Sequence, residues 1–330
     1  MSVHQKWFSI KEWWLYINKM LISDIMQSLT QNDKYWGEFE EKDMDAILTL
    51  CAENNFDGVR KYVEEKLNRT DFIFGSARSD FLYLSNIDKN SVCLDVGCGL
   101  GAHTFNMAKI AKEVHACDLS KKRVQFCEYR KEMEKAENVF LYHSNIENLS
   151  FEKERFDFIV MNGVVEWLGE KNKNKNPRED QLEDLRKIYS LLKSGGMLYI
   201  GIENRYAATY LHNAKDHNKL KYTTFMPRFL ADWVTRIRKG KAYRTYTYGK
   251  LGYERLLKKV GFDSNELHFY VAHPGYNMPQ YLIDFADNSA FSFFFSNSGL
   301  NKFLKYLLKQ KIAIEIVKRF FYSYVIFAKK

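Results

Sequence analysis

One short segment constrains the fold of this 330-residue chain more than any other. A mostly apolar run at 92–96 leads directly into glycines at every second position, Gly97, Gly99 and Gly101, and a helical pattern follows at 102–112. Glycines allow the backbone to turn tightly and to approach a ligand closely. A buried strand, a glycine loop and a helix in this order predict a loop that holds a nucleotide-like cofactor.

Two acidic residues near this loop distinguish between cofactors. Asp95 lies two residues before the first glycine, where it would repel a pyrophosphate and attract a cationic amino-acid group. It therefore favours S-adenosylmethionine over NAD, although 97–102 also satisfies the looser dinucleotide pattern. Asp118 ends the next predicted strand and can accept hydrogen bonds from both ribose hydroxyls of either cofactor.

Short β-branched runs alternate with charged segments of helical spacing along most of the chain. The predicted strands are 91–96, 113–117, 139–142, 156–161, 197–202, 268–272 and 321–327, and the predicted helices are 102–112, 121–135, 178–192 and 250–260. We expect the helix at 178–192 to stop at Gly195 and Gly196. This alternation is typical of an α/β fold, here a Rossmann-like, mostly parallel seven-stranded sheet flanked by helices.

Four motifs occur in a fixed order: the loop at 95–101, the acid Asp118, the pair Phe156 and Asp157, and the turn at 193–196. Together they resemble class I S-adenosylmethionine-dependent methyltransferases over 72–203. The resemblance implies a methyltransferase (EC 2.1.1.-) whose cofactor is S-adenosylmethionine. It also implies three regions: an N-terminal helical cap at 1–70, the cofactor-binding core at 71–205, and acceptor-side insertions with the last strands of the sheet at 206–330.

The resemblance assigns expected roles to single residues. The loop glycines would contact the methionine part of the cofactor, Asp95 its amino group, Asp118 its ribose and Arg78 its carboxylate. Asn145 stands where the family often has an aspartate for the adenine amino group, and an amide oxygen can accept the same hydrogen bond. Asn162 would face the sulfonium. The expected cofactor-binding residues are Arg78, Asp95, Gly97, Cys98, Gly99, Gly101, Asp118, Leu119, Asn145, Ile146 and Asn162.

A narrower resemblance extends into the C-terminal half. The segments at 163–169, 202–206, 215–217, 243–247 and 274–279 resemble a bacterial subgroup of methyltransferases that is associated with glycan and lipopolysaccharide assembly. This resemblance implies a small-molecule, sugar or lipid-linked glycan acceptor.

Three residues are candidates for catalysis. Methyl transfer from a sulfonium is an in-line displacement, so the enzyme mainly aligns the groups and excludes water, and an alcohol acceptor also benefits from a base. Glu166 follows the fourth predicted strand, and Asp216 and His217 lie beyond the fifth, where α/β sheets bind ligands. Glu166 could instead cap a short helix or pair with Arg205, and Asp216 with His217 could form a cap or a surface ion pair.

The net charge of +9 is unevenly distributed. Residues 1–205 carry −4 and 260–299 also −4, whereas 206–259 carry 13 Lys and Arg against 3 Asp and Glu, and 300–330 carry 8 against 1. This pattern indicates an anionic acceptor or surface on the C-terminal side. A nucleic-acid-directed methyltransferase remains an alternative, disfavoured because no Asn-Pro-Pro-Tyr-like motif follows Asn162. A non-catalytic membrane-surface or partner-binding module is a third reading.

The segment at 300–309 has Leu300, Phe303, Leu304, Leu307 and Leu308 on one helical face and lysines on the other. It predicts a helix that packs on its own domain or, alternatively, on an anionic membrane. The five cysteines include no Cys-x-x-Cys pair, and no histidine cluster has metal-ligand spacing, so no disulfide scaffold and no metal site is expected. We expect a cytoplasmic protein, with peripheral contact at the inner membrane face as an alternative, and the sequence leaves the oligomeric state open.

Overall fold

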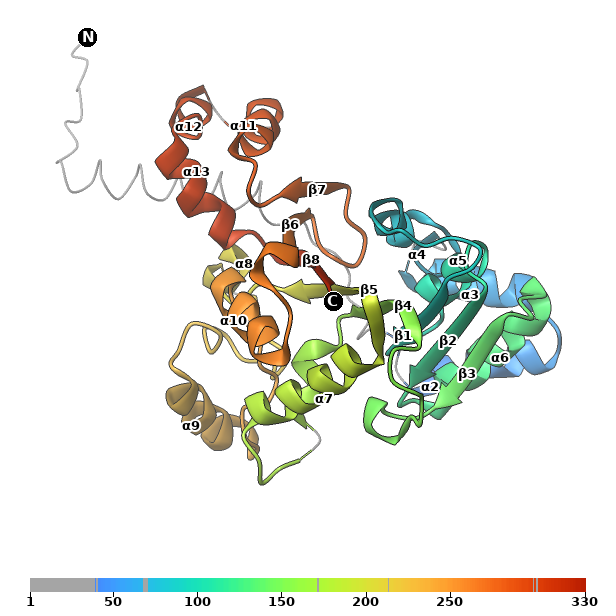
Figure 1. Cartoon of the computed structure of the whole chain (residues 1–330). Coiled ribbons are helices and arrows are strands. Elements are labelled where there is room, and N and C mark those ends of the chain that lie inside the picture. The colour runs from blue at the N-terminus through green and yellow to red at the C-terminus, as the bar shows by residue number, and fades with distance from the viewer. Residues whose placement is uncertain are drawn as a thin grey trace, which may run out of the picture.

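The computed structural model describes residues 39, 41–67, 71–170, 172–212, 214–298, 300 and 302–330. A central eight-stranded sheet has the strand order β3-β2-β1-β4-β5-β8-β6-β7 (Figure 1). Five neighbouring strands run parallel, while β8 is antiparallel to β5 and β6, and β7 is antiparallel to β6. The strands are β1 (Val92–Val96), β2 (Glu113–Asp118), β3 (Val139–His143), β4 (Phe156–Asn162), β5 (Leu192–Glu203), β6 (Leu267–His273), β7 (Tyr281–Asp284) and β8 (Ser323–Lys329).

Helices cover both faces of this sheet. One apolar core lies beneath the N-terminal helices, and the other lies beneath the later helices α7, α10, α11 and α13. The first group is α2 (Glu41–Ala52), α3 (Phe56–Leu67), α4 (Asp71–Phe74), α5 (Ala102–Ala108) and α6 (Lys121–Glu134). The second group is α7 (Pro177–Leu191), α10 (Lys250–Val260), α11 (Asn288–Asn297) and α13 (Lys311–Val317). The prediction of an α/β Rossmann-like sheet flanked by helices is confirmed.

Several predicted boundaries were wrong. The sheet has eight strands rather than seven, because the short edge strand β7 follows a proline-rich turn and is too brief to show alternation. Helix α5 ends at Ala108 rather than at residue 112, since the Lys112 amide already donates to Ser91 and the chain turns into β2. The last strand begins at Ser323, two residues later than the predicted start at 321.

The glycine pair after α7 does not separate the helix from the strand. Strand β5 begins at Leu192, immediately after the helix, and Gly195 lies within it at a positive φ of 78°. The pairing of β5 with β4 changes register across this stretch, between Phe156 and Phe158. The two glycines therefore belong to an irregular strand start rather than to a helix end.

The parallel register gathers the predicted site residues at one edge. Val96 is paired with both Cys117 and Met161, and Asn162 is paired with Gly201. Because parallel strands have their carboxyl ends at the same edge, the loops after β1, β2, β4 and β5 emerge side by side. This edge is where the candidate site lies.

Two apolar residues of the segment at 300–309 pack on its own domain. Leu300 and Leu308 are buried in the core with α11 and α13, and α12 (Lys302–Leu307) spans six residues of the segment. None of the helices in the described part of the chain combines the length and apolarity needed to cross a bilayer. Residues 1–38 of the predicted N-terminal helical cap lie outside the described residues.

Candidate active site

The glycine loop is held tightly against its neighbours. The amides of Gly97 and Cys98 both donate to the carbonyl of Cys117, at 2.8 and 3.0 Å. Gly97, Gly99 and Gly101 have φ values of 71°, 58° and 77°, which L-residues rarely adopt. A Cβ on Gly97 would lie 2.6 Å from Val164 Cγ2, so the loop after β1 is in contact with the loop after β4.

Asp118 connects strand β2 to the same loop. Its Oδ2 accepts a hydrogen bond from the Gly99 amide at 2.9 Å, and its Oδ1 accepts one from the Ser120 amide at 2.8 Å. Each carboxylate oxygen retains acceptor capacity, because it can accept two hydrogen bonds. The adjacent Leu119 is largely exposed. Asp118 is thus held in a fixed orientation beside the glycines, as its predicted role on a ribose requires.

Asp95 is a buried carboxylate beneath the loop. Its Oδ2 accepts a hydrogen bond from Thr104 Oγ1 at 2.6 Å, on the helix that follows the glycines. Burial is the main cause that raises the pKa of Asp95 to about 6; the charge of Asp118 acts in the same direction, and the Thr104 hydrogen bond and the Arg78 charge oppose it. The site therefore has a carboxyl group that a bound cation would stabilise in its charged form.

Arg78 is committed to the protein itself. Its guanidinium donates to the carbonyl and to Oδ1 of Asn277, at 2.8 and 3.2 Å, and lies over the ring of Phe72 at 4.2 Å. Asn162 Nδ2 donates to the same Asn277 Oδ1 at 3.1 Å, and Asn162 Oδ1 accepts from Tyr199. These side chains tie the segment before β1 to the ends of β4 and β6, so a cofactor contact of Arg78 stays a prediction.

The predicted adenine-side residues follow β3. The side chain of Asn145 caps a short 3-10 helix, Ile146–Asn148, by accepting from the Asn148 amide at 3.0 Å. Ile146 is buried in the core, and Cys98 is buried within the loop. All five cysteines are free and buried. A direct contact of Asn145, Ile146 or Cys98 with adenine or methionine stays a prediction.

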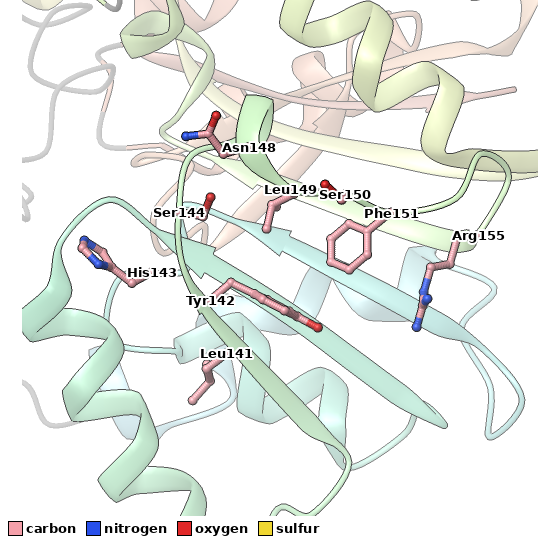
Figure 2. A pocket seen from close by; sticks show the side chains of 9 residues that line it. All are labelled: Leu141, Tyr142, His143, Ser144, Asn148, Leu149, Ser150, Phe151 and Arg155. Carbon is pink, nitrogen blue, oxygen red and sulfur yellow. The ribbon is translucent and has the colours of Figure 1, made fainter.

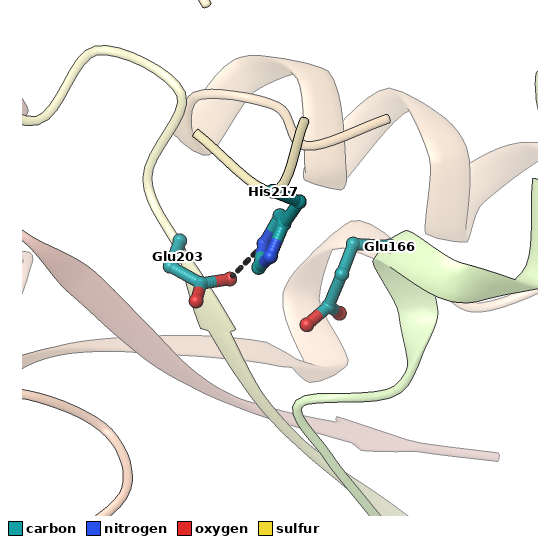
Figure 3. A group of neighbouring side chains, drawn as sticks. All are labelled: Glu166, Glu203 and His217. Atoms are coloured by element: carbon teal, nitrogen blue, oxygen red, sulfur yellow. Dashed lines mark hydrogen bonds and ion pairs between the residues drawn. The ribbon is translucent and has the colours of Figure 1, made fainter. Parts of the chain in front are cut away.

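Three ionisable side chains from distant segments converge beyond the ends of β4 and β5 (Figure 3). Glu166 lies in a 3-10 helix, Val165–Glu170, Glu203 ends β5, and His217 lies in the loop after α8 (Ala208–Leu211). His217 Nε2 is 3.4 Å from Glu203 Oε2, and one ligand atom from each of the three side chains lies within 4.8 Å of the others. We call these residues the Glu-Glu-His cluster.

The three groups of the cluster set one another's charge. Burial, together with the charge of Glu203, raises the pKa of Glu166 to about 8. Burial lowers the pKa of His217, but Glu203 outweighs it and brings the pKa to about 9. The charge of His217 likewise overcomes burial and holds the pKa of Glu203 below its ordinary value. At neutral pH the cluster therefore combines a His217–Glu203 ion pair with a protonated Glu166.

Asp216 is adjacent to His217 but has a different function in the structure. Its Oδ1 accepts from the amides of Asn218 and Leu220, and its Oδ2 accepts from the Thr223 hydroxyl at 2.7 Å. These bonds hold the turn that carries His217. Glu166 does not pair with Arg205, whose guanidinium donates to the carbonyls of Thr224 and Met226.

Glu203, Tyr276 and Asn277 were not among the predicted site residues, although the narrower resemblance covers the segments at 202–206 and 274–279 that contain them. The Tyr276 hydroxyl donates to Glu203 Oε1 at 3.2 Å, and Asn277 joins Arg78 to Asn162. Glu203 could have been found, because it ends the fifth strand at the edge where ligands bind. The resemblance at 274–279 pointed to the turn that holds Tyr276 and Asn277, but it assigned no contact to either residue.

The open depression of about 620 Å³ in Figure 2 lies elsewhere, along β3 and the loop that follows it. None of the predicted cofactor or catalytic residues lines it. Its walls are Leu141, Tyr142, His143, Ser144, Asn148, Leu149, Ser150, Phe151 and Arg155.

A family model described as a methyltransferase domain matches residues 87–250. A demethylmenaquinone methyltransferase from Geobacillus sp. (strain WCH70) is 29% identical over 122 residues, which are 36% of this chain and 48% of that protein. An uncharacterized protein from Rickettsia prowazekii (strain Madrid E) is 26% identical over 153 residues, 42% of this chain and 58% of that protein. The chain therefore spans about half the length of the curated relatives it matches.

Solved structures give a weaker likeness. A phosphoethanolamine N-methyltransferase 2 from Haemonchus contortus has a TM-score of 0.47 at 15% identity, over 85% of this chain and 58% of that one. A SAM-dependent methyltransferase from Aquifex aeolicus has a TM-score of 0.43 at 13% identity, over 78% and 91%. The strand order, the glycine loop and the family match agree: residues 87–250 are a methyltransferase domain of the class I S-adenosylmethionine-dependent fold, which confirms the expected enzyme class and cofactor at the level of the domain.

Proposed function

We propose that the whole chain transfers a methyl group from S-adenosylmethionine to a hydroxyl oxygen of a sugar or lipid-linked glycan. The observation that carries this proposal is the Glu-Glu-His cluster, which lies beyond β4 and β5 at the same sheet edge as the glycine loop. Contact between the two loops at Gly97 and Val164 supports a donor site and an acceptor site that adjoin.

The residues around the loop fit the cofactor. Gly97, Gly99 and Gly101 would admit its methionine part, Asp95 would bind the ammonium group, and Asp118 would bind the ribose. When bound, S-adenosylmethionine supplies an electrophilic methyl carbon on a sulfonium. The protein's part is to hold donor and acceptor in line and to exclude water.

An oxygen acceptor is supported by the chemistry of the cluster. A neutral hydroxyl must lose its proton as its oxygen bonds to the methyl carbon, while the carbon–sulfur bond breaks and its electron pair stays on sulfur. Glu203, which is ionised at neutral pH, can accept the proton of the hydroxyl, while the protonated Glu166 and His217 can donate hydrogen bonds to the acceptor oxygen. We retain Glu166 and His217 from the predicted catalytic set and add Glu203. The hydrogen bonds of Asp216 support a positioning role for that residue.

A lipid-borne acceptor is supported by helix α9 (Arg228–Lys239), which stands apart from the sheet in Figure 1. Phe229, Trp233 and Ile237 recur every fourth residue, so they lie on one face, and they are 77%, 61% and 64% exposed. Exposed basic side chains flank this stripe: Arg236, Arg238, Lys239 and Lys241. Apolar side chains bordered by cations are typical of helices that lie in the surface of an anionic bilayer.

Sedimentation with vesicles tests the contribution of α9. We expect the protein to bind phosphatidylglycerol-containing vesicles and to leave pure phosphatidylcholine vesicles unbound, with binding lost at high salt. A variant with Phe229→Ser and Trp233→Ser should lose most of this binding. The matched control is Leu251→Ser, an exposed apolar residue on another helix. Equal binding by the α9 variant and the control would remove the membrane argument.

Labelled methyl transfer tests the function itself. Radiolabelled S-adenosylmethionine is incubated with the protein and with lipid-linked glycan, small-metabolite and total RNA fractions. We expect label in the glycan fraction. Label confined to RNA would establish the nucleic-acid alternative, and calorimetric binding of NAD in place of S-adenosylmethionine would overturn the proposal. Cofactor binding without transfer to any fraction would favour a non-catalytic module.

A further inference from the structure

The Glu-Glu-His cluster has a donor set that no single stretch of the sequence contains. Glu166, Glu203 and His217 come from three segments, and each directs one oxygen or nitrogen into the same space (Figure 3). The distance of 3.4 Å between His217 Nε2 and Glu203 Oε2 matches two ligands on one ion. Bonds of about 2.0–2.2 Å in a tetrahedral site separate neighbouring ligand atoms by roughly 3.4 Å.

Glu166 provides a second and independent observation. Its side chain is fully buried, and neither carboxylate oxygen accepts a hydrogen bond of ordinary geometry from the described residues, although its own amide and the Trp167 side chain lie close enough to lower its pKa. Burying an unpaired carboxyl group costs free energy, so buried carboxylates are ordinarily hydrogen-bonded or bound to a metal. One of its oxygens lies within 4.8 Å of a ligand atom of Glu203 and of His217. Both of its oxygens are therefore available to a ligand held between the three residues.

We infer that Glu166, Glu203 and His217 bind one divalent transition-metal ion. A bound ion displaces the protons of Glu166 and His217, and the resulting two carboxylates and neutral imidazole neutralise its charge of +2. A set of one nitrogen and two oxygens suits Zn²⁺ or Mn²⁺ better than Ca²⁺, which takes oxygen ligands, or Cu⁺, which takes sulfur. Because the protein supplies three ligands, at least one position stays open for another molecule, as in catalytic rather than structural metal sites.

Neighbouring side chains support these ligands. The Tyr276 hydroxyl donates to Oε1 of Glu203, the oxygen that does not face His217, at 3.2 Å. The ring of Trp167 packs edge-on against the imidazole of His217, with ring centroids 4.9 Å apart. The turn held by Asp216 fixes the backbone on which His217 stands. Such second-layer contacts orient ligands and are a regular part of metal sites.

A metal at this place would deepen the proposed function. An acceptor hydroxyl in the open position would lose its proton to water more readily, as water does when it is bound to zinc. This consequence rests on the proposed function, whereas the binding of the ion does not. The site can therefore be tested without any acceptor.

The test uses the full chain after chelation and dialysis, with Zn²⁺ followed by calorimetry and Mn²⁺ by electron paramagnetic resonance. We expect one equivalent of metal to bind. The variants Glu166→Gln, Glu203→Gln and His217→Gln should each bind at least tenfold more weakly. His212→Gln is the matched control, because this exposed histidine lies five residues earlier on the same segment. It should bind as the parent protein does.

Two further measurements keep the outcomes distinct. Circular dichroism confirms that each variant is folded, and S-adenosylmethionine affinity is measured for each by calorimetry. Absence of metal binding by the folded parent protein, or equal binding by all four variants, overturns the metal site. The metal site is supported if the three cluster variants lose metal binding while their affinity for S-adenosylmethionine is unchanged. Failure of the parent to bind S-adenosylmethionine would overturn the proposed function and leave the metal result standing.

Discussion

The cofactor side and the acceptor side of this molecule are built in opposite ways. On the cofactor side, Asp95, the glycines and Asp118 lie within 24 residues of sequence, and each is fixed by local hydrogen bonds. On the acceptor side, the cluster assembles residues 166, 203 and 217, and its supports reach residue 276. A site read from one contiguous segment can be found by motif, whereas a site assembled by topology needs the fold.

The largest effect expected is on methyl transfer itself, from a change on the acceptor side. Glu203→Gln should lower the transfer rate by about 10²–10⁴, the range of proton-transfer catalysis, because the His217–Glu203 pair is lost. Affinity for S-adenosylmethionine should stay within about twofold of the parent value, because Glu203 is expected to act independently of the cofactor-binding residues. Rate assays and calorimetry on one preparation measure both. A parallel loss of cofactor affinity would break the division between the two sides.

A change on the cofactor side should instead weaken the binding of S-adenosylmethionine. Asp95→Ala removes the buried carboxylate and should weaken S-adenosylmethionine binding by about 2–3 kcal/mol, typical for a charge-assisted bond in a buried site. The control Thr104→Val removes the hydrogen bond to Asp95 but keeps its charge, so its effect should be smaller. Calorimetry gives both values. Equal affinity for Asp95→Ala and the parent would refute the assignment of Asp95.

The pH dependence of cofactor binding should come from the same residue. Asp95 has a pKa of about 6, and its charged form is the one that attracts the ammonium group. Affinity should therefore be constant above pH 7 and fall, by up to about tenfold per pH unit, as the pH drops below 6. Calorimetry across this range should show the slope in the parent and a flat profile in Asp95→Asn. A slope that survives in Asp95→Asn would assign it to another group.

The smallest effect concerns stability. Gly97→Ala should lower the free energy of unfolding by about 1–3 kcal/mol, because alanine is strained at positive φ and its Cβ would meet Val164. Gly195→Ala is a matched control with a similar φ of 78° and no atom within 4 Å of the added Cβ. The excess loss in Gly97→Ala, measured by chemical denaturation, reports how tightly the two loops adjoin. Equal losses of stability in the two variants would mean that the loops after β1 and β4 are not in close contact at Gly97.

The sequence predicted the fold well where the pattern was local. Alternating strands and helices, the glycine loop and Asp118 are all short-range signals, and their places in the sheet followed from the rules of parallel strands. The eighth strand was missed because four residues carry too little pattern. The contact between Glu203 and Tyr276 was not predicted, because it arises only when β5 and the turn after β6 are packed together.

The amphipathic signals illustrate the same limit. The segment at 300–309 and helix α9 both combine apolar side chains with lysine or arginine, and only the former was singled out. In the fold, Leu300 and Leu308 are buried whereas Phe229 and Trp233 are exposed. Periodicity shows that a helix has an apolar face, but tertiary packing decides whether another element covers it.

The position of β8 has a consequence for how the chain is made. Strand β8 lies between β5 and β6 in the sheet, although it follows β7 by 38 intervening residues in the sequence. A ribosome therefore delivers β6 and β7 well before the strand that joins them to the parallel half. The nascent protein can complete its cofactor loop early, but the pair β6 and β7 must wait for β8. Tyr276, which follows β6, is thus among the last residues to reach its place beside Glu203.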